Sequence, residues 1–463
     1  MADLRVEEAD WLLTLDSQRR IIRDGALAVE GGRIVAVGKT PETRAAHPAA
    51  RVISARGKVV TPGLIDSHIH TTFQLSRGLA DEVGSRRFLF ERMYPYEGAL
   101  DEDDARVSIR LCVLELLKNG VTTFIDAGNY QPHLTAEVAG EAGMRCVVAR
   151  SSFDVTKSAM GVLPPAFIET ADEALERAEA FVQKLHGAHD GRVHAWFQFR
   201  GLNNSSDRLI VDLKRLADRY GVGVQTHACF ARDTMESSKA QHGVTEIERL
   251  DRLGLLGPNV LPVHGGWATE RELELLRGHD VKVVAAPSSS LHNAYGNIAR
   301  GHVPELLEAG VAVGLGSDHA SSGIVDLCQE MFLVAGAYKE VRGNAEVMPP
   351  ERVLEMVTVN GARCALREAE VGSIEVGKRA DLVLFDTARP EWQPLYNPVA
   401  NLVYSATGRS VETVIVDGKV IVEGGTVRTL DEPAVIDAAR RRAPAILDKT
   451  KLGALVAPKW PVS

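Results

Sequence analysis

Four histidines and one aspartate stand in this 463-residue chain where they could share a metal ion. His68 and His70 are two residues apart, so in an extended segment both imidazoles point to the same side. His227, His264 and Asp318 each end a short apolar run much further along the chain. Imidazole nitrogens and a carboxylate oxygen suit zinc, iron, cobalt or manganese. The pattern predicts a metal site, provided that the apolar runs end at one place in the fold.

Eight short apolar runs carry or precede these residues, and amphipathic stretches separate the runs. Their nearly continuous hydrophobicity is typical of parallel strands that are buried on both faces. Eight strand–helix units predict a TIM (β/α)8 barrel, in which the strands end at one common face. A doubly wound sheet is the alternative, but no GxGxxG motif follows the first run. The runs are Val59–Asp66, Gly120–Asp126, Arg145–Arg150, Arg192–Arg200, Val222–His227, Val260–His264, Val281–Ala286 and Val311–Asp318. The helical stretches include Asp101–Lys118, Asp172–Leu185, Ser206–Tyr220 and Thr269–Arg277.

The two ends of the chain predict a second, smaller domain. Closely spaced β-branched runs without helices fill the beginning, and similar runs return near the end. We therefore predict an α/β protein whose barrel carries a small β-sandwich domain built from both chain ends. The predicted parts are residues 1–60 and 369–428 for the β-sandwich, 61–368 for the barrel and 429–463 for a helical tail.

The composition excludes several classes of protein. The net charge is −9 without a basic block, which argues against nucleic-acid binding. No apolar run approaches the roughly 18 residues of a membrane span, and charges stand where a signal peptide would be apolar. Five scattered cysteines without a CxxC motif fit a reducing compartment and argue against a thiolate zinc cluster. We expect a cytoplasmic protein that acts on a small molecule, with neither nucleic acid nor a membrane as partner.

Three segments of the chain resemble the amidohydrolase superfamily. They are Pro62-Gly-Leu-Ile-Asp-Ser-His-Ile-His70, Gly316-Ser-Asp318, and the stretch from Val371 to Phe385, which is similar to the return into the β domain of those enzymes. The similarity covers nearly the whole chain and is strongest to the branch of cytosine deaminases and chlorohydrolases, which binds a single metal. The fourth run ends in Gln-Phe-Arg, without the lysine that binuclear relatives carry there.

This resemblance implies a role for each of the five residues. His68, His70, His227 and Asp318 would be the metal ligands, and His264 would hydrogen-bond the attacking water or the substrate carbonyl. Asp318 would take the water's proton and pass it to the leaving group. The cofactor would be one divalent metal per subunit, Zn(II) before Co(II), Fe(II) or Mn(II), and it would lower the pKa of its water toward ~7. The family also favours a homo-oligomer.

Several other residues are expected near the substrate. Gln74 and Arg200 are expected to contact it, although Arg200 could instead hold an acid such as Glu91 or Glu97. His292 is expected as a catalytic hydrogen-bond donor, with exposure to solvent as the alternative. Deaminases of this branch carry a glutamate three residues after the fifth-strand histidine, where this chain has Phe230. A phenyl ring transfers no proton, so Phe230 is expected to line an apolar substrate pocket.

The loss of that glutamate favours acyclic carbonyl chemistry. The predicted activity is attack by metal-bound hydroxide that cleaves a C–N or C–S bond of a urea, carbamate or thiocarbamate. In this respect the chain is similar to the phenylurea and molinate hydrolases, which act on such herbicides. The alternative is a deaminase or chlorohydrolase of a nitrogen heterocycle, in which His292 or another group replaces the missing acid. A non-catalytic scaffold is disfavoured, because such relatives lose metal ligands and this chain has all five positions.

Overall fold

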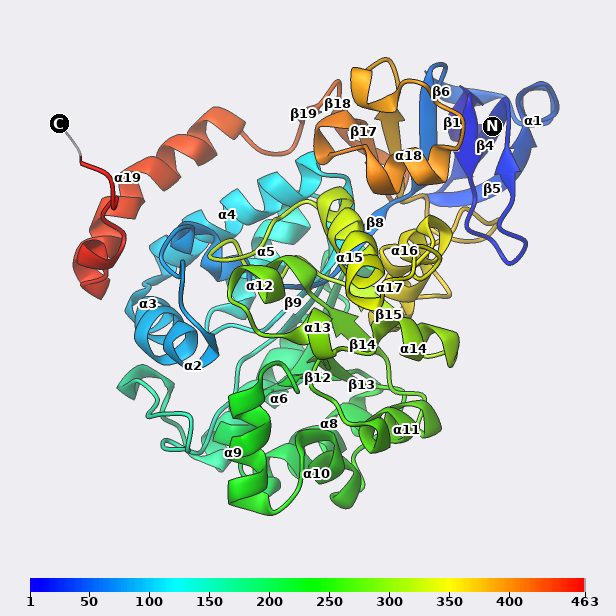
Figure 1. Ribbon diagram of the computed structural model, residues 1–463. Helices are drawn as coiled ribbons and strands as arrows, with labels where there is room; N and C mark the ends of the chain where they lie inside the picture. The colour runs from blue at the N-terminus through cyan, green and yellow to red at the C-terminus, as the bar shows by residue number, and fades with distance from the viewer. Residues whose placement is uncertain (462–463) are drawn as a thin grey trace.

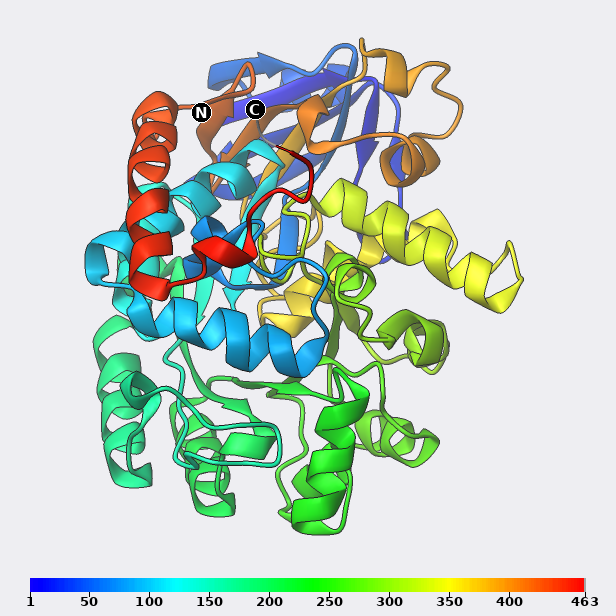
Figure 2. The same ribbon diagram turned by 60° about the vertical axis from the view of Figure 1, so that its left-hand side comes forward.

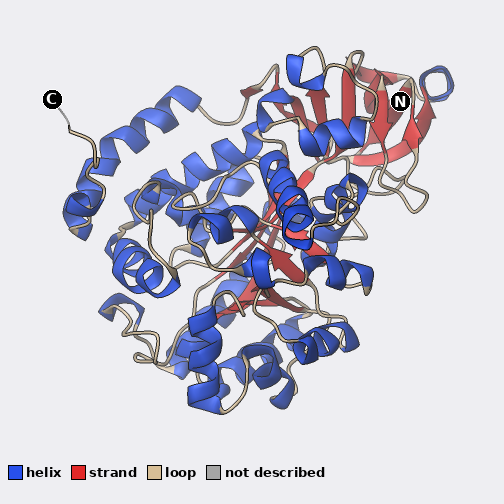
Figure 3. Ribbon diagram, in the orientation of Figure 1, coloured by secondary structure: helices blue, strands red, loops and turns tan. Residues whose placement is uncertain are grey.

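The computed structural model describes residues 1–461, which form a barrel with a smaller β domain beside it (Figure 1). Eight parallel strands lie in chain order in one sheet. Helices surround this sheet (Figure 3). The strands are β8 (Leu64–Ile69), β9 (Val121–Asp126), β10 (Arg145–Ala149), β11 (Val193–Gly201), β12 (Val224–Ala228), β13 (Val260–His264), β14 (Val283–Ala285) and β15 (Val313–Leu315). The predicted TIM barrel is therefore confirmed.

Backbone hydrogen bonds bring the first and last barrel strands together. Asp318 N donates to His68 O at 2.8 Å, and His70 N donates to Asp318 O at 2.6 Å. The segments that close the barrel thus carry three of the five residues predicted to form the metal site. Their relative positions follow from barrel closure.

Polar residues in the sequence mark where several barrel helices begin. Asp101, Thr170 and Thr269 each cap a helix and form a capping box with the residue three positions later. These helices begin within one residue of the predicted stretches. The helices around the barrel are α4 (Glu102–Lys118), α5 (Pro132–Glu141), α6 (Ala171–Leu185), α8 (Asp207–Tyr220), α9 (Arg232–His242), α10 (Glu246–Arg252), α11 (Glu270–Gly278), α12 (Pro287–His292), α13 (Asn297–Arg300), α14 (Val303–Glu308), α15 (Leu327–Arg342), α16 (Pro350–Met356) and α17 (Val359–Cys364).

The first predicted run, Val59–Asp66, is two strands in the structure. Its first half lies in β7 (Lys58–Pro62), which belongs to the β domain, and its second half lies in β8. Gly63 separates them, and a Cβ atom there would lie 2.1 Å from Thr122 Oγ1. The chain passes from one domain into the other at this residue, and the contact with Thr122 leaves room only for glycine.

Both chain ends contribute strands to the β domain, as predicted. A four-stranded and a seven-stranded sheet share one hydrophobic cluster, in which Leu4 and Val6 of the small sheet meet Val60 and Leu382 of the large one. The small sheet contains β1 (Ala2–Ala9), β4 (Gly25–Glu30), β5 (Arg33–Lys39) and β6 (Ala49–Ser54). The large sheet contains β2 (Trp11–Leu13), β3 (Ile21–Ile22), β7, β16 (Leu382–Asp386), β17 (Val411–Val416), β18 (Lys419–Glu423) and β19 (Thr426–Val427). The domain limits given above stay predictions.

A buried charged joint links the barrel to the β domain. Arg145 on β10 is 1% exposed, and its guanidinium donates to Asp381 at 3.2 and 3.3 Å and to Asp417 at 2.8 Å. Both aspartates flank strands of the large sheet. The joint holds the β domain against the start of β10, and removing Arg145 would leave a buried charge unpaired, which is costly.

The C-terminal helix α19 (Glu432–Thr450) lies along α4 on the outside of the barrel (Figures 1 and 2). Lys449 pairs with Asp101 at 2.5 Å and with Asp104 at 2.6 Å. Ile446 joins a hydrophobic cluster with Phe73 and Phe88, two residues that also line the active-site cavity described below. Neither α19 nor any other helix within residues 1–461 is long and apolar enough to cross a bilayer.

Candidate active site

The structure brings together all five residues that the sequence places at strand ends. His68 lies in β8 and His70 directly follows it, His227 and His264 come from β12 and β13, and Asp318 lies in the turn after β15. His70 Nε2 lies 3.3 Å from His227 Nε2, and Asp318 Oδ1 lies 3.4 Å from His68 Nε2. Ligand atoms of His68, His70 and His227 lie within 4.8 Å of one another, as do those of His68, His264 and Asp318.

The hydrogen bonds around this cluster fit a metal ion. Both ring nitrogens of buried His68 lack a hydrogen-bond partner in the described part of the chain. Buried polar atoms are rarely left without a partner, and a metal ion bound by one of these two nitrogens would supply one of the missing partners. His227 Nδ1 contacts the carbonyl oxygen of Arg200 at 2.7 Å, which directs Nε2 toward the other imidazoles. The cluster can therefore hold a single divalent metal.

Burial sets the protonation states of these groups. It lowers the pKa of His70 and of His227 well below the ordinary value and the pKa of His264 to about 4. Burial works to raise the pKa of Asp318, but the surrounding imidazoles, His319 foremost, outweigh it and hold that pKa well below its ordinary value. Neutral imidazoles and an ionised carboxylate are the forms that bind a divalent metal.

The backbone at the cluster is strained. His264 and Asp318 have φ angles of 81° and 64°, in the left-handed region that residues with a Cβ rarely adopt. Such conformations cost about 1–3 kcal/mol each and persist only where their surroundings enforce them. Asp66 supplies part of that enforcement, because its carboxylate accepts from His68 N at 3.1 Å and from Ser317 N at 3.2 Å. This carboxylate therefore ties the ligand segments after β8 and β15 to each other.

A cavity opens onto the cluster, and its empty space, counted together with the open solvent at its mouth, is about 700 Å³. Its wall is mainly aromatic and includes a π-helical turn, η2 (Phe88–Met93), and the start of α3 (Tyr94–Ala99). The apolar residues of the wall include Phe73, Phe88, Leu89, Phe90, Tyr94, Phe153, Met160, Phe230 and Tyr295. The polar ones include Arg200, Asn203, Asn204, Thr234, Glu246 and His319.

Phe230 and Arg200 both line this cavity, where the sequence places them. The Phe230 ring lies 5.6 Å from that of His264 and 5.5 Å from that of Tyr295, centre to centre. Arg200 Nη1 donates to Glu97 at 2.5 Å, and both side chains are almost completely buried. Arg200 thus faces the cavity and holds Glu97, and its contact with substrate stays a prediction.

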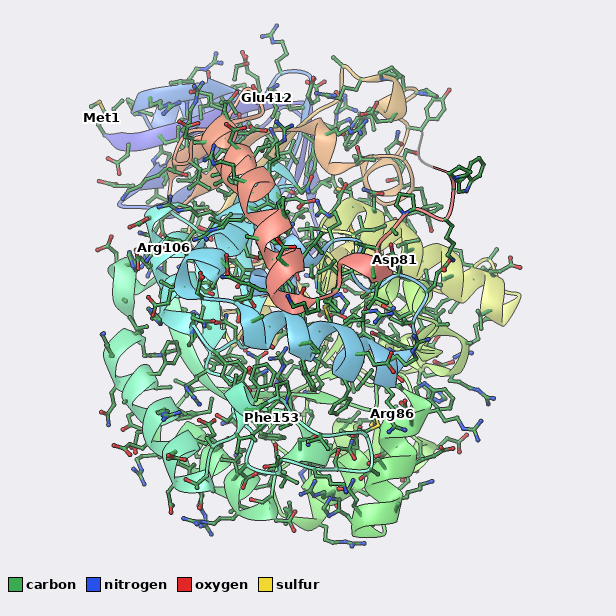
Figure 4. The ribbon with its side chains drawn as sticks, turned by 90° about the vertical axis from the view of Figure 1, so that its left-hand side faces the viewer. Met1, Asp81, Arg86, Arg106, Phe153 and Glu412 are labelled. Atoms are coloured by element: carbon green, nitrogen blue, oxygen red, sulfur yellow. The ribbon has the colours of Figure 1, made fainter. Side chains whose placement is uncertain are left out.

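Gln74 and His292 lie elsewhere, which corrects two expectations about the site. Gln74 is buried in a short helix after β8, and its amide donates to Glu115 outside the cavity wall. His292 ends α12, and its imidazole, with 40% of the side chain exposed, pairs with Asp81 at 2.9 Å. Spacing along the sequence could not show that α12 turns this side chain outward, toward the loop that carries Asp81. Figure 4 shows Asp81 on this outer surface, beside the C-terminal tail.

Two further polar residues of the site are absent from the sequence predictions. His319 Nε2 lies 3.5 Å from Asp318 Oδ2, and its ring stacks on Phe88 at 4.7 Å. The sequence does offer one indication of the role of His319, because this residue directly follows the predicted ligand Asp318. Glu246 enters the cavity wall from the first residue of α10, and no motif surrounds it in the sequence.

The barrel and its imidazole–carboxylate cluster define a metal-dependent hydrolase. The model of the amidohydrolase family matches residues 59–421, and a bacterial imidazolonepropionase-like composite domain matches residues 25–50. The chain belongs to the amidohydrolase family and is a metal-dependent enzyme that hydrolyses carbon–nitrogen bonds.

Relatives are similar to this chain over almost its full length. A 5'-deoxyadenosine deaminase of Methanosarcina acetivorans is 32% identical, covering 96% of this chain and 98% of its own. A 5-methylthioadenosine/S-adenosylhomocysteine deaminase of Desulforudis audaxviator is 35% identical over 92% and 95% of the two chains. Among solved structures, an adenosine deaminase of Xanthomonas campestris with bound zinc is 29% identical, with a TM-score of 0.89 and coverage of 96% and 99%.

Proposed function

We propose that this enzyme deaminates an amino-substituted nitrogen heterocycle of adenine type by hydrolysis. The observation that carries the proposal is the cavity itself, where aromatic side chains that can pack against a planar ring line the approach to the metal cluster. The names of the relatives support the same reaction class. Deamination of a heterocycle therefore replaces hydrolysis of a urea, carbamate or thiocarbamate as the main proposal.

The proposed metal is zinc, held by His68, His70, His227 and Asp318, as in the sequence prediction. When bound, it would supply a water molecule of lowered pKa. Asp318, ionised beside the imidazoles, would accept a proton from that water. His264, which is neutral, would donate or accept a hydrogen bond at the reacting carbon's substituents, and its left-handed backbone holds it at the cavity.

The proposed substrate contacts divide between apolar and polar parts of the wall. Phe230 and Tyr295 would lie against the faces or edges of the heterocycle. Arg200 would donate a hydrogen bond to an acceptor of the substrate from the opposite, charged part of the wall. Cytoplasmic location and a homo-oligomeric state stay predictions.

A second candidate is hydrolysis of a urea, carbamate or thiocarbamate, as in the phenylurea and molinate hydrolases. Phe230 favours it, because the ring stands where heterocycle deaminases of the resembled branch carry a glutamate. Acyclic carbonyl substrates need no protonated ring nitrogen. An apolar substituent on such a substrate would also match the aromatic wall.

Product analysis of the zinc-loaded protein separates the two candidates. The panel contains 5'-deoxyadenosine, methylthioadenosine, cytosine, a chlorotriazine, a phenylurea and a thiocarbamate, and mass spectrometry identifies the products. Release of ammonia from an adenine ring is the expected result. Release of an amine or thiol from the acyclic compounds, with every heterocycle unchanged, would overturn the proposal and establish the second candidate.

A further inference from the structure

A second carboxyl group faces the active-site cavity from outside the metal cluster. Among the described residues that line the cavity, the acids are Asp318 and Glu246. Asp318 is engaged by His68 and His70 at 3.4 and 3.6 Å. Glu246, on α10, is therefore the cavity acid that remains free of the imidazoles.

Hydrogen bonds hold the Glu246 carboxyl against the loop after β12. One oxygen accepts from Cys229 N at 2.5 Å, and the other accepts from Asn203 Nδ2 at 3.0 Å. Cys229 lies two residues after His227 and directly before Phe230, so the carboxyl lies beside the segment that joins the metal cluster to the aromatic wall. Glu246 is 2% exposed, which limits its contacts with solvent to the cavity side.

The surroundings of Glu246 favour a protonated carboxyl near neutral pH. Burial raises its pKa to about 7, and the neighbouring Glu272 carboxylate on α11 acts in the same direction. The Cys229 amide, Arg249 on the same helix and Asn203 act in the opposite direction. Two acids in one cavity with opposite protonation states are the arrangement that general acid–base catalysis requires.

We infer that Glu246 is the proton donor to the substrate heterocycle, an assignment that rests on the proposed deamination. It fills the role that Phe230 cannot perform, from a different element of the fold. The assignment also specifies the substrate, because only a ring with a basic nitrogen next to the amino-bearing carbon can use this donor.

The proton transfers balance over the reaction. Glu246 gives its proton to the ring nitrogen while the water oxygen bonds to the adjacent carbon and the C=N double bond opens. Asp318 takes the proton that the water releases and passes it to the amino group, after which the C–N bond breaks and ammonia leaves. The hydroxyl on the carbon becomes a carbonyl by returning its proton to Glu246. Both carboxyls end in their starting states.

The variants E246Q and E272Q test this assignment as a matched pair. The amide in E246Q is neutral, like the protonated acid, and still accepts from Cys229 N, but it has no acidic proton to give. Glu272 is equally buried and accepts from Ile247 N at 2.8 Å, but it does not line the cavity. We would measure kcat, KM and bound zinc for each variant, and record infrared spectra of the metal-free proteins across neutral pH.

The expected result is a loss of about 100- to 10,000-fold in kcat for E246Q, with zinc content unchanged, and a much smaller loss for E272Q, which keeps the donor but removes a carboxylate that raises its pKa. The infrared band of protonated carboxyls is expected to be weaker in E246Q than in the unsubstituted protein, where buried Glu330, whose pKa is also raised, contributes to the same band. A kcat of E246Q within about threefold of the unsubstituted enzyme, equal losses in both variants, or a carboxyl band of unchanged strength in E246Q would each overturn the assignment.

The same measurements distinguish failure of the assignment from failure of the proposed function. If the unsubstituted protein deaminates no aminoheterocycle, the proposed function fails and the assignment fails with it. If it deaminates one and E246Q does so equally well, only the assignment of Glu246 fails.

Discussion

Replacing Arg200 with methionine leaves the Glu97 carboxyl buried without its partner. In the native protein the two groups are 2.5 Å apart, and their side chains are 4% and 1% exposed. Removing one member of a buried ion pair typically costs about 3–5 kcal/mol of unfolding free energy, because the remaining charge is desolvated and unpaired. We expect a loss of this size in R200M near and above neutral pH.

The loss in R200M should depend on pH. Burial raises the pKa of Glu97, and removing the guanidinium, which opposes that shift, raises it further. Between the unfolded and the folded pKa of this group, the folded state binds more protons. The unfolding free energy therefore falls as pH rises through this interval, by at most about 1.4 kcal/mol per pH unit. The contribution of Glu97 to the stability of the variant is therefore fully present only below the unfolded pKa of this group.

Urea unfolding followed by the fluorescence of the five tryptophans measures this effect at several pH values. The double variant R200M/E97Q is the control, because it removes both charges and keeps the side-chain volume similar. We expect it to recover most of the lost stability and to lose the added pH dependence. The reasoning is refuted if R200M unfolds at the same urea concentration as the native protein at every pH, or if the double variant is less stable than R200M.

Three further predictions concern other parts of the molecule. H227A should lose zinc and turnover together, because it removes an imidazole from the cluster. Metal analysis after dialysis and an activity assay measure this, with the surface variant H279A as control. Persistence of both zinc and activity in H227A would contradict the prediction. H292A should change kcat by less than about threefold, since His292 lies outside the cavity against Asp81, and a loss of a hundredfold or more would assign it to the chemistry. R145M should lower the unfolding free energy by about 3–5 kcal/mol, because it leaves the buried Asp381 carboxylate without its arginine partner, and an unchanged urea midpoint would show that this pair contributes nothing.

The fold and the cluster of five residues could be predicted from local patterns. A buried barrel strand is recognisable in the sequence as a short apolar run, and the parallel strands of a barrel all end at the same face. A histidine or aspartate at the end of a run is therefore placed near the others without knowledge of any contact. His68, His70, His227, His264 and Asp318 meet for this reason. Capping residues such as those before α4 and α6 likewise act within one helical turn, so their effect is visible in the sequence.

The boundary between the two domains required the structure. The run Val59–Asp66 has one continuous apolar pattern, yet Gly63 divides it between two sheets. The division depends on Thr122, a residue of a different strand that fills the space a side chain at position 63 would need. Such an exclusion arises only after distant segments are packed together.

The substrate side of the site also depends on contacts between distant segments. The sequence alone determined a metal-dependent hydrolase barrel, because its strand ends and ligand types are local features. Only the tertiary structure turned His292 outward to Asp81, paired Arg200 with Glu97, and brought Glu246 from the start of α10 to the cavity. Loops and helix ends form the cavity wall, and their side-chain directions follow from packing between segments far apart in the chain, which periodicity and spacing do not encode.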